Sequence, residues 1–164
     1  MKFAKVEAVL NEQISEEISS AYLYLAMSAW LEHQGFPGAA HWMKGQYKEE
    51  LSHGEKLFEF MNDRGSRVTL NAIEKPAAEF GTLLDTFKAV LAHERKVTAL
   101  INRCYEVAIA EKDYAAQIAL QWFITEQVEE EKSAQDIITQ LEACDNRPHL
   151  MLMIDHQLAK RGGN

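Results

Sequence analysis

The sequence predicts an all-α protein, a four-helix up-down bundle with one long crossover connection and a short C-terminal fifth helix. Four long segments place apolar residues three or four positions apart, which lines one face of each helix. The 3 prolines all lie at expected breaks, and no long stretch alternates apolar and polar residues as a half-buried strand would. A long segment without helical periodicity separates the second helix from the third. Such a segment suits a bundle of two hairpins joined by a crossover.

The first two helices are expected over residues 3–33 and 37–64. The break between them is Gly35-Phe36-Pro37-Gly38, and Gly65 provides the stop after the second helix. Residues 66–81 then form the crossover, which is longer than two adjacent antiparallel helices need.

The third helix is expected over residues 82–111, and the fourth follows an N-cap at Asp113 and continues to residue 143. A fifth helix is expected over about 147–160, because residues 150–154 are all apolar. A single short helix is marginally stable in water, so we expect it to pack on the bundle or on a neighbouring subunit.

Length and composition bound the class of protein. The 164 residues suit one domain over 1–164, with the bundle over about 3–143 and fraying at 162–164. A net charge of −8 would repel nucleic acid and anionic lipid, so we expect neither as a partner. Cys104 and Cys144 form no CxxC pair, which makes a disulfide framework or a structural zinc site improbable. Without a signal-peptide core or a membrane-length apolar run, a cytoplasmic protein is the expectation.

The informative anomaly is a set of carboxylates within the apolar stripes. Each long helix carries one near its middle: Glu17, Glu50, Glu94 and Glu130. A single such glutamate is usually a side chain that reaches water or pairs with a cation. Four in one interior would repel one another, and no Lys or Arg occupies the same stripes to compensate. A bound multivalent cation would supply the missing positive charge.

The spacing on the second helix supports a metal site. Glu50 and His53 are three residues apart and project from one helix face, which is the Glu-x-x-His pattern of di-iron carboxylate bundles. The pattern is weak alone and becomes specific when the other three stripes each add a glutamate. An oxygen-rich set with one imidazole suits Fe or Mn, with Zn as a competitor.

Further residues have two interpretations each. Glu49, Glu126 and Glu129 are either a solvated acidic face or a third cation site beside the metal pair. Tyr24 lies two helical turns after Glu17 on the same face. It is either a core aromatic with a satisfied hydroxyl or a residue that holds a metal ligand or donates an electron.

At this point the sequence resembles prokaryotic non-haem ferritins over essentially its whole length. The most specific pieces are Glu49-Glu50-Leu51-Ser52-His53 and Leu120-Gln121-Trp122-Phe123-Ile124-Thr125-Glu126-Gln127-Val128-Glu129-Glu130-Glu131. The resemblance implies a homo-oligomeric cage of about 24 subunits that stores ferric mineral. It also implies that no haem is bound. Leu51 stands where bacterioferritins place the haem-ligating methionine, and Gln127 and Glu130 stand where they carry a second Glu-x-x-His.

The resemblance also implies roles for individual residues. Glu17, Glu50 and His53 would bind one iron, and Glu50, Glu94 and Glu130 the other, with Glu50 bridging. Gln127 and Tyr24 would lie beside the centre, and Glu49, Glu126, Glu129 and Glu130 would form a third iron site.

The expected activity is oxidation of Fe(II) by O2 or H2O2, that is, a ferroxidase that supplies an iron store. Two other classes stay open from the sequence. One is a di-iron enzyme that acts on an organic substrate or on peroxide, and the other is a bundle that only buffers divalent ions. Oxygen consumption on addition of Fe(II) would separate the last of these from the first two.

Overall fold

The computed structural model describes residues 3–161, and in that range it is all helix and loop, with no strand. The helices are α1 Ala4–His33, α2 Pro37–Asp63, α3 Leu83–Ala110, α4 Tyr114–Ala143 and α5 Pro148–Leu158. Their bounds confirm the predicted elements to within about two residues. The expected fraying at 162–164 lies outside the described residues. No described helix is both long and apolar enough to cross a membrane.

Local chemistry explains where several helices begin and end. The Thr82 hydroxyl oxygen accepts from the Asp85 amide, and the Asp85 carboxylate accepts from the Thr82 amide, so a capping box starts α3. Asp113 caps α4 as predicted, since its carboxylate accepts from the Ala116 amide at 3.1 Å. Gly65 has φ +72°, the left-handed conformation that commonly follows a helix.

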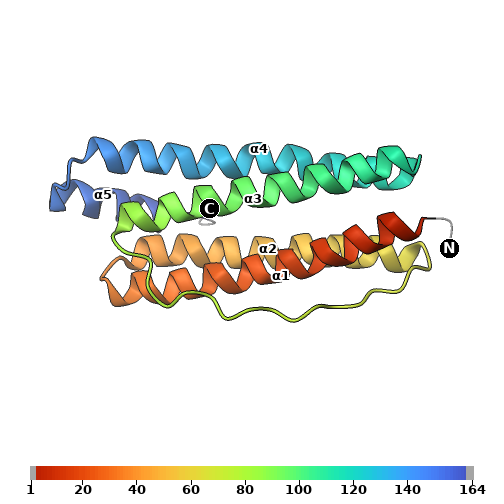
Figure 1. Ribbon diagram of the computed structural model, residues 1–164. Helices are drawn as coiled ribbons and strands as arrows, with labels where there is room; N and C mark the ends of the chain where they lie inside the picture. The colour runs from red at the N-terminus through yellow and green to blue at the C-terminus, as the bar shows by residue number, and fades with distance from the viewer. Residues whose placement is uncertain (1–2, 162–164) are drawn as a thin grey trace.

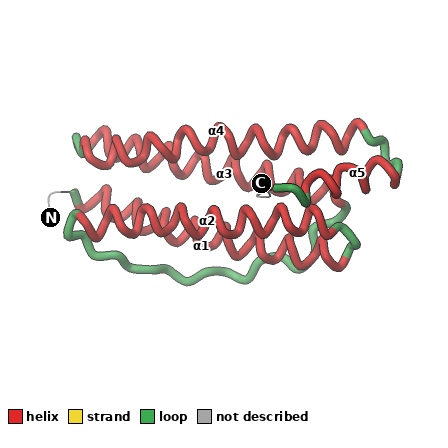
Figure 2. Tube along the Cα trace, turned by 180° about the vertical axis from the view of Figure 1, so that it is seen from behind, coloured by secondary structure: helices red, strands yellow, loops and turns green. Residues whose placement is uncertain are grey.

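The helices form two hairpins that pack side by side (Figure 1). α1 and α2 make one hairpin, α3 and α4 make the other, and the crossover returns the chain along the bundle so that α2 and α3 run parallel (Figures 1 and 2). The crossover is tied to α1 by hydrogen bonds. The amides of Thr69 and Asn71 donate to the side chains of Asn11 and Ser15, at 2.8 and 3.0 Å.

Two apolar clusters fill the bundle, and every long helix contributes to both. The α5-side cluster includes Met27, Met43, Phe87, Leu91, Ala134 and Ile137. The far cluster includes Leu10, Ile14, Leu57, Val97, Ile101 and Phe123. Between them in each helix lies a buried polar layer, made of Glu17, Gln46, Glu50, His53, Glu94, Gln127 and Glu130. The apolar stripes are therefore interrupted at the same depth in all four helices.

The fifth helix packs on the bundle. Asp155 is 2% exposed, and its carboxylate accepts from the Gly38 amide at 3.1 Å and from the Ala39 amide at 2.7 Å. It thus caps the beginning of α2, where amide groups are otherwise unpaired and a negative charge is stabilised. Ile154 and Leu158 join the α5-side cluster, so this short helix is anchored by both polar and apolar contacts.

Candidate metal centre

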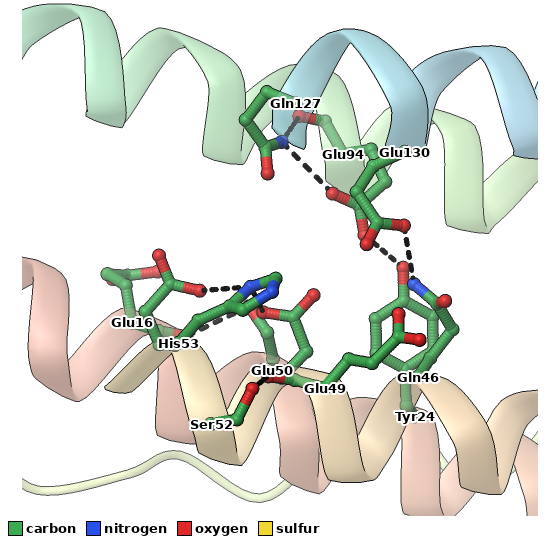
Figure 3. A network of polar contacts seen from close by, with 12 residues as sticks. Glu16, Tyr24, Gln46, Glu49, Glu50, Ser52, His53, Glu94, Gln127 and Glu130 are labelled. Atoms are coloured by element: carbon green, nitrogen blue, oxygen red, sulfur yellow. Dashed lines mark hydrogen bonds and ion pairs between the residues drawn. The ribbon is translucent and has the colours of Figure 1, made fainter. Parts of the chain in front are cut away.

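The four glutamates predicted from the stripes are all buried in the polar layer. Their exposed fractions are 1% for Glu17, 0% for Glu50, 0% for Glu94 and 6% for Glu130. Side chains of α2 face those of α3 and α4 across the interior (Figure 3). Periodicity explains the convergence, because the apolar residues on either side of each glutamate hold that helix face toward the core.

One half of the layer comes from the α1–α2 hairpin. His53 Nδ1 lies 3.7 Å from a carboxylate oxygen of Glu17 and 3.7 Å from one of Glu50. These three residues each present a ligand atom within 4.8 Å of the others. Gln13 donates to the second oxygen of Glu17 at 2.7 Å and fixes that carboxylate from outside the group. The geometry suits a cation held by two carboxylates and one imidazole.

The other half comes from α3 and α4. The Tyr24 hydroxyl donates to one carboxylate oxygen of Glu94, and the Gln127 amide donates to the other at 3.1 Å. Gln46 of α2 donates to Glu130 at 2.8 Å and so bridges the two hairpins (Figure 3). Each carboxylate in this half therefore has a hydrogen-bond donor that fixes its orientation, as donors to metal-binding carboxylates commonly do.

Several oxygens in the layer have no hydrogen-bond partner within the described structure. They are both carboxylate oxygens of Glu50, one carboxylate oxygen of Glu17 (Oε2) and the amide oxygen of Gln46. An unpaired buried carboxylate oxygen is costly, because water no longer solvates it. Glu50 also lies at the middle of the layer, with His53 and Glu17 on one side and the Glu94 carboxylate within electrostatic range. Divalent cations held by these carboxylates would satisfy their unpaired oxygens, so the residues present fit such ions.

Burial and mutual repulsion perturb the titration of the layer. Burial raises the pKa of Glu50 well above its usual range, and it raises the pKa of Glu94. Burial, reinforced by the nearby Glu94 charge, raises the pKa of Glu130 to about 7. Burial lowers the pKa of His53, but its contacts with Glu17 and Glu50 outweigh that effect and raise the pKa to about 10. Burial raises the pKa of Glu17, and contacts with His53, Glu50 and Gln13 reverse this and lower it overall.

Cation binding is expected to tighten as pH rises from about 6 to about 8. His53, with a pKa of about 10, and Glu130, with a pKa of about 7, both hold protons in the metal-free protein near the lower pH. A divalent cation needs a neutral imidazole and charged carboxylates, so it must displace those protons. We expect the Kd for Zn(II) to fall by about tenfold per pH unit for each proton displaced.

Calorimetric titration with Zn(II) in buffers of different ionisation enthalpy would measure both the Kd and the proton release. Glu130→Gln removes one titrating group and should flatten the dependence between these pH values. A Kd that is the same at both pH values would contradict this assignment of protons.

The outer acids predicted as a third site are only partly brought together. Glu126 lies with His53 and Glu130, each offering a ligand atom within 4.8 Å of the others. Glu49 instead forms an ion pair with Arg161 at 2.7 Å, and Glu129 is exposed to solvent. The structure thus places Glu126 beside His53 and Glu130, while Glu49 has another partner.

Sequence reasoning missed three amides and hydroxyls that support the layer. Gln46 lies four residues before Glu50 on the same stripe, and that position was the available signal. Gln13, four residues before Glu17, gave the same signal. Thr98, four residues after Glu94, has the same spacing, and its hydroxyl accepts a hydrogen bond from Gln127 at 3.2 Å. Trp122 also lies edge-on to the His53 ring, with the ring centroids 5.2 Å apart.

A four-helix bundle with a long crossover, and with glutamates from all four helices and one Glu-x-x-His in its core, defines the class of ferritin-like carboxylate bundles. A sequence model of the ferritin-like domain matches residues 7–144. The chain belongs to the ferritin family.

Relatives of known name and structure agree with this assignment. A bacterial non-haem ferritin of Bacteroides fragilis is 40% identical over 157 residues, which is 96% of this chain and 98% of that protein. One of Staphylococcus epidermidis is 38% identical over 96% of this chain and 95% of its own length. A crystal structure of an open-pore ferritin from the archaeon Archaeoglobus fulgidus is 42% identical, with a TM-score of 0.93 over 94% of this chain and 96% of that one.

Proposed function

We propose that this protein stores iron, and that it oxidises Fe(II) to Fe(III) at the polar layer before the iron is deposited as ferric mineral. The observation that carries the proposal is the set of buried carboxylate oxygens of Glu50 and Glu17 that no hydrogen bond satisfies. Divalent iron is a substrate that these oxygens and one imidazole can hold. Membership of the ferritin family and similarity to bacterial non-haem ferritins support the same substrate.

In this proposal each half of the layer holds one Fe(II). Glu17 and His53 bind the first ion, Glu94 and Glu130 bind the second, and Glu50 bridges them. The two ions give up two electrons, which reduce O2 with two protons to H2O2, or reduce H2O2 with two protons to two waters. The protein holds the ions at a fixed separation and compensates their charge.

Other side chains tune this arrangement. Tyr24 and Gln127 hold Glu94 in place by donating to its two carboxylate oxygens. His53 and Glu130 release protons as Fe(II) binds, because at neutral pH a pKa of about 10 keeps His53 protonated and a pKa of about 7 keeps Glu130 partly protonated. Glu126, Glu129 and Glu49, together with Glu130, form a third iron site outside the pair. Zn and Mn are expected to bind the same oxygen-rich set, and no haem is involved.

We further propose that the chain assembles into a homo-oligomeric cage of about 24 subunits. Apolar side chains are exposed in areas where a lone chain would leave them in water. Ile109, Tyr114 and Ile118 near the turn from α3 to α4 are 52%, 71% and 70% exposed. Tyr22 and Leu25 on α1 are 48% and 37% exposed and line a groove beside crossover residues 75–78. Contacts between subunits would cover such surfaces.

Aerobic loading with Fe(II), followed by size-exclusion chromatography with iron and protein followed together, tests the proposal. The expected result is iron in large excess over the centre's two or three ions per chain, co-eluting with a particle of about 24 subunits. Iron limited to about two or three ions per chain on a small oligomer would overturn storage. Oxygen consumption would then indicate an enzyme acting on another substrate, and its absence would indicate a cation buffer.

A further inference from the structure

Arg161, just after α5, reaches across the bundle surface to the residue beside the central Glu50. Its Nη2 donates to the Glu49 carboxylate at 2.7 Å, and its Nη1 donates to the Trp42 carbonyl oxygen at 3.3 Å. The guanidinium also lies over the Trp42 ring, 4.5 Å from the ring centroid. Its own backbone carbonyl oxygen is 2.9 Å from His41 Nε2. Three side-chain contacts and one backbone contact therefore fix Arg161 along α2.

α2 is shaped to receive this side chain. Trp42, Gly45 and Glu49 fall three and four residues apart, so they share one helix face. A Cβ at Gly45 would lie 3.2 Å from Arg161 Nε and 3.3 Å from its Cδ, so the glycine leaves the space that the arginine fills. Asp155 anchors the same tail at the start of α2. The tail thus follows α2 from its first turn to Glu49.

Among the four acids proposed for the third iron site, Glu49 is the one that is paired with Arg161. Glu126 and Glu130 already lie together with His53, whereas Glu49 is paired with the guanidinium. The pair is partly open to water, with the side chains of Arg161 and Glu49 24% and 44% exposed. An ion pair that is partly solvated is weak enough for a divalent cation to displace.

We propose that Arg161 is a built-in counter-ion that holds Glu49 away from the third cation site, so that a third iron must displace the arginine to recruit this carboxylate. The inference rests on the proposed function, since it presumes a third iron beside the pair. Arg161 acts through Glu49 and is a positioning residue. The tail after α5 thereby sets how tightly the third ion is held relative to the first two.

Anaerobic calorimetric titration of the assembled protein with Fe(II) tests this inference. For Arg161→Gln we expect the third ion's Kd to fall about fivefold, the effect of removing a partly exposed competing ion pair. Arg161→Lys keeps the charge and should retain most of the wild-type Kd. Arg103→Gln removes an equal charge from an exposed pair with Glu12, and should change the third ion's Kd by less than about twofold.

Glu49→Gln, alone and combined with Arg161→Gln, shows whether the effect passes through the carboxylate. It should cancel the gain made by Arg161→Gln, so the two changes are not additive. A merely structural role of Arg161 predicts a lower melting temperature with an unchanged third Kd.

The outcomes separate this inference from the function beneath it. One outcome is that every variant binds two ions tightly and that the Kd of the third ion is unchanged in Arg161→Gln and Arg161→Lys. This outcome would overturn the role of Arg161 and would leave the proposed iron centre intact. Failure of any chain, wild type included, to bind two Fe(II) would overturn the proposed function itself. Should Arg161→Gln not assemble, a third Kd that Glu49→Gln leaves unchanged would equally overturn the inference, because the third ion would then not recruit Glu49.

Discussion

Joint replacement of Glu50 and His53 by alanine is expected to slow the initial oxidation of Fe(II) by at least about a hundredfold while leaving the bundle folded. Loss of a residue that only orients a metal ligand commonly costs ten- to a hundredfold in affinity or activity, and these two residues would be ligands themselves. Glu50 is also the proposed bridge, so its loss affects both ions.

The fold should survive this change because Glu50 has no hydrogen bond in the described structure, and its ion-pair partner His53 is removed together with it. Both of its carboxylate oxygens are buried without a hydrogen bond, and burial raises its pKa well above the usual range. Removing such a group relieves a desolvation cost, which offsets the space left behind. Helix content and particle size should therefore match the wild type.

Oxygen consumption after mixing with Fe(II) measures the rate. A matched control is Glu55→Ala with Glu59→Ala, which removes two acids from the exposed face of the same helix. It should oxidise iron at close to the wild-type rate. Wild-type kinetics in the Glu50 and His53 variant would remove the polar layer from consideration as the oxidation site.

Gly38→Ala is expected to lower the free energy of unfolding by about 3 kcal/mol and to detach α5. A Cβ at this position would lie 1.8 Å from the backbone oxygen of Asp155 and 2.6 Å from its carbonyl carbon. These are backbone atoms, so α5 must move as a unit. Movement would break the bonds from the Gly38 and Ala39 amides to the Asp155 carboxylate. The helix propensity gained by alanine, about 1 kcal/mol, does not offset this.

Denaturant unfolding of the metal-free protein at fixed concentration measures the loss, and hydrogen exchange over residues 148–158 reports the release of α5. Gly54→Ala is the control on the same helix, because its Cβ would meet Ile18 Cγ1 at 3.4 Å, an ordinary contact. It should leave stability unchanged or raise it by up to about 1 kcal/mol. Wild-type exchange rates for α5 in Gly38→Ala would show that the docking described above is not needed to hold it.

The sequence predicted the bundle well because periodicity and capping are local properties. Leu91 and Val97 lie within one helix turn of Glu94 on either side. These neighbours alone indicate that Glu94 faces the core and where along the helix the polar layer lies. Asp113 predicted the start of α4 because aspartate is a preferred N-cap residue. Predictions of this kind need only neighbours along the chain.

Contacts that cross between distant elements could not be predicted in this way. The Arg161–Glu49 pair joins residues 112 positions apart, and Arg161 belongs to no periodic segment. The Gln46–Glu130 bond spans 84 positions and depends on how the two hairpins meet. Whether Glu49 faces a cation or an arginine is decided by where the chain's tail lies, which the spacing of acids in α2 and α4 does not contain.

The two apolar clusters on either side of the polar layer constrain how ions travel. Both are closely packed across all four helices, so they seal the bundle along its long axis in both directions. Hydrated cations cannot cross such material, since they would lose their water without gaining ligands. Traffic to and from the layer must therefore run transversely, between adjacent helices. On one such side Glu129 is exposed, Glu126 is half-buried and Glu130 is buried. These carboxylates therefore lie at increasing depth, and they would attract a cation from solvent toward the polar layer.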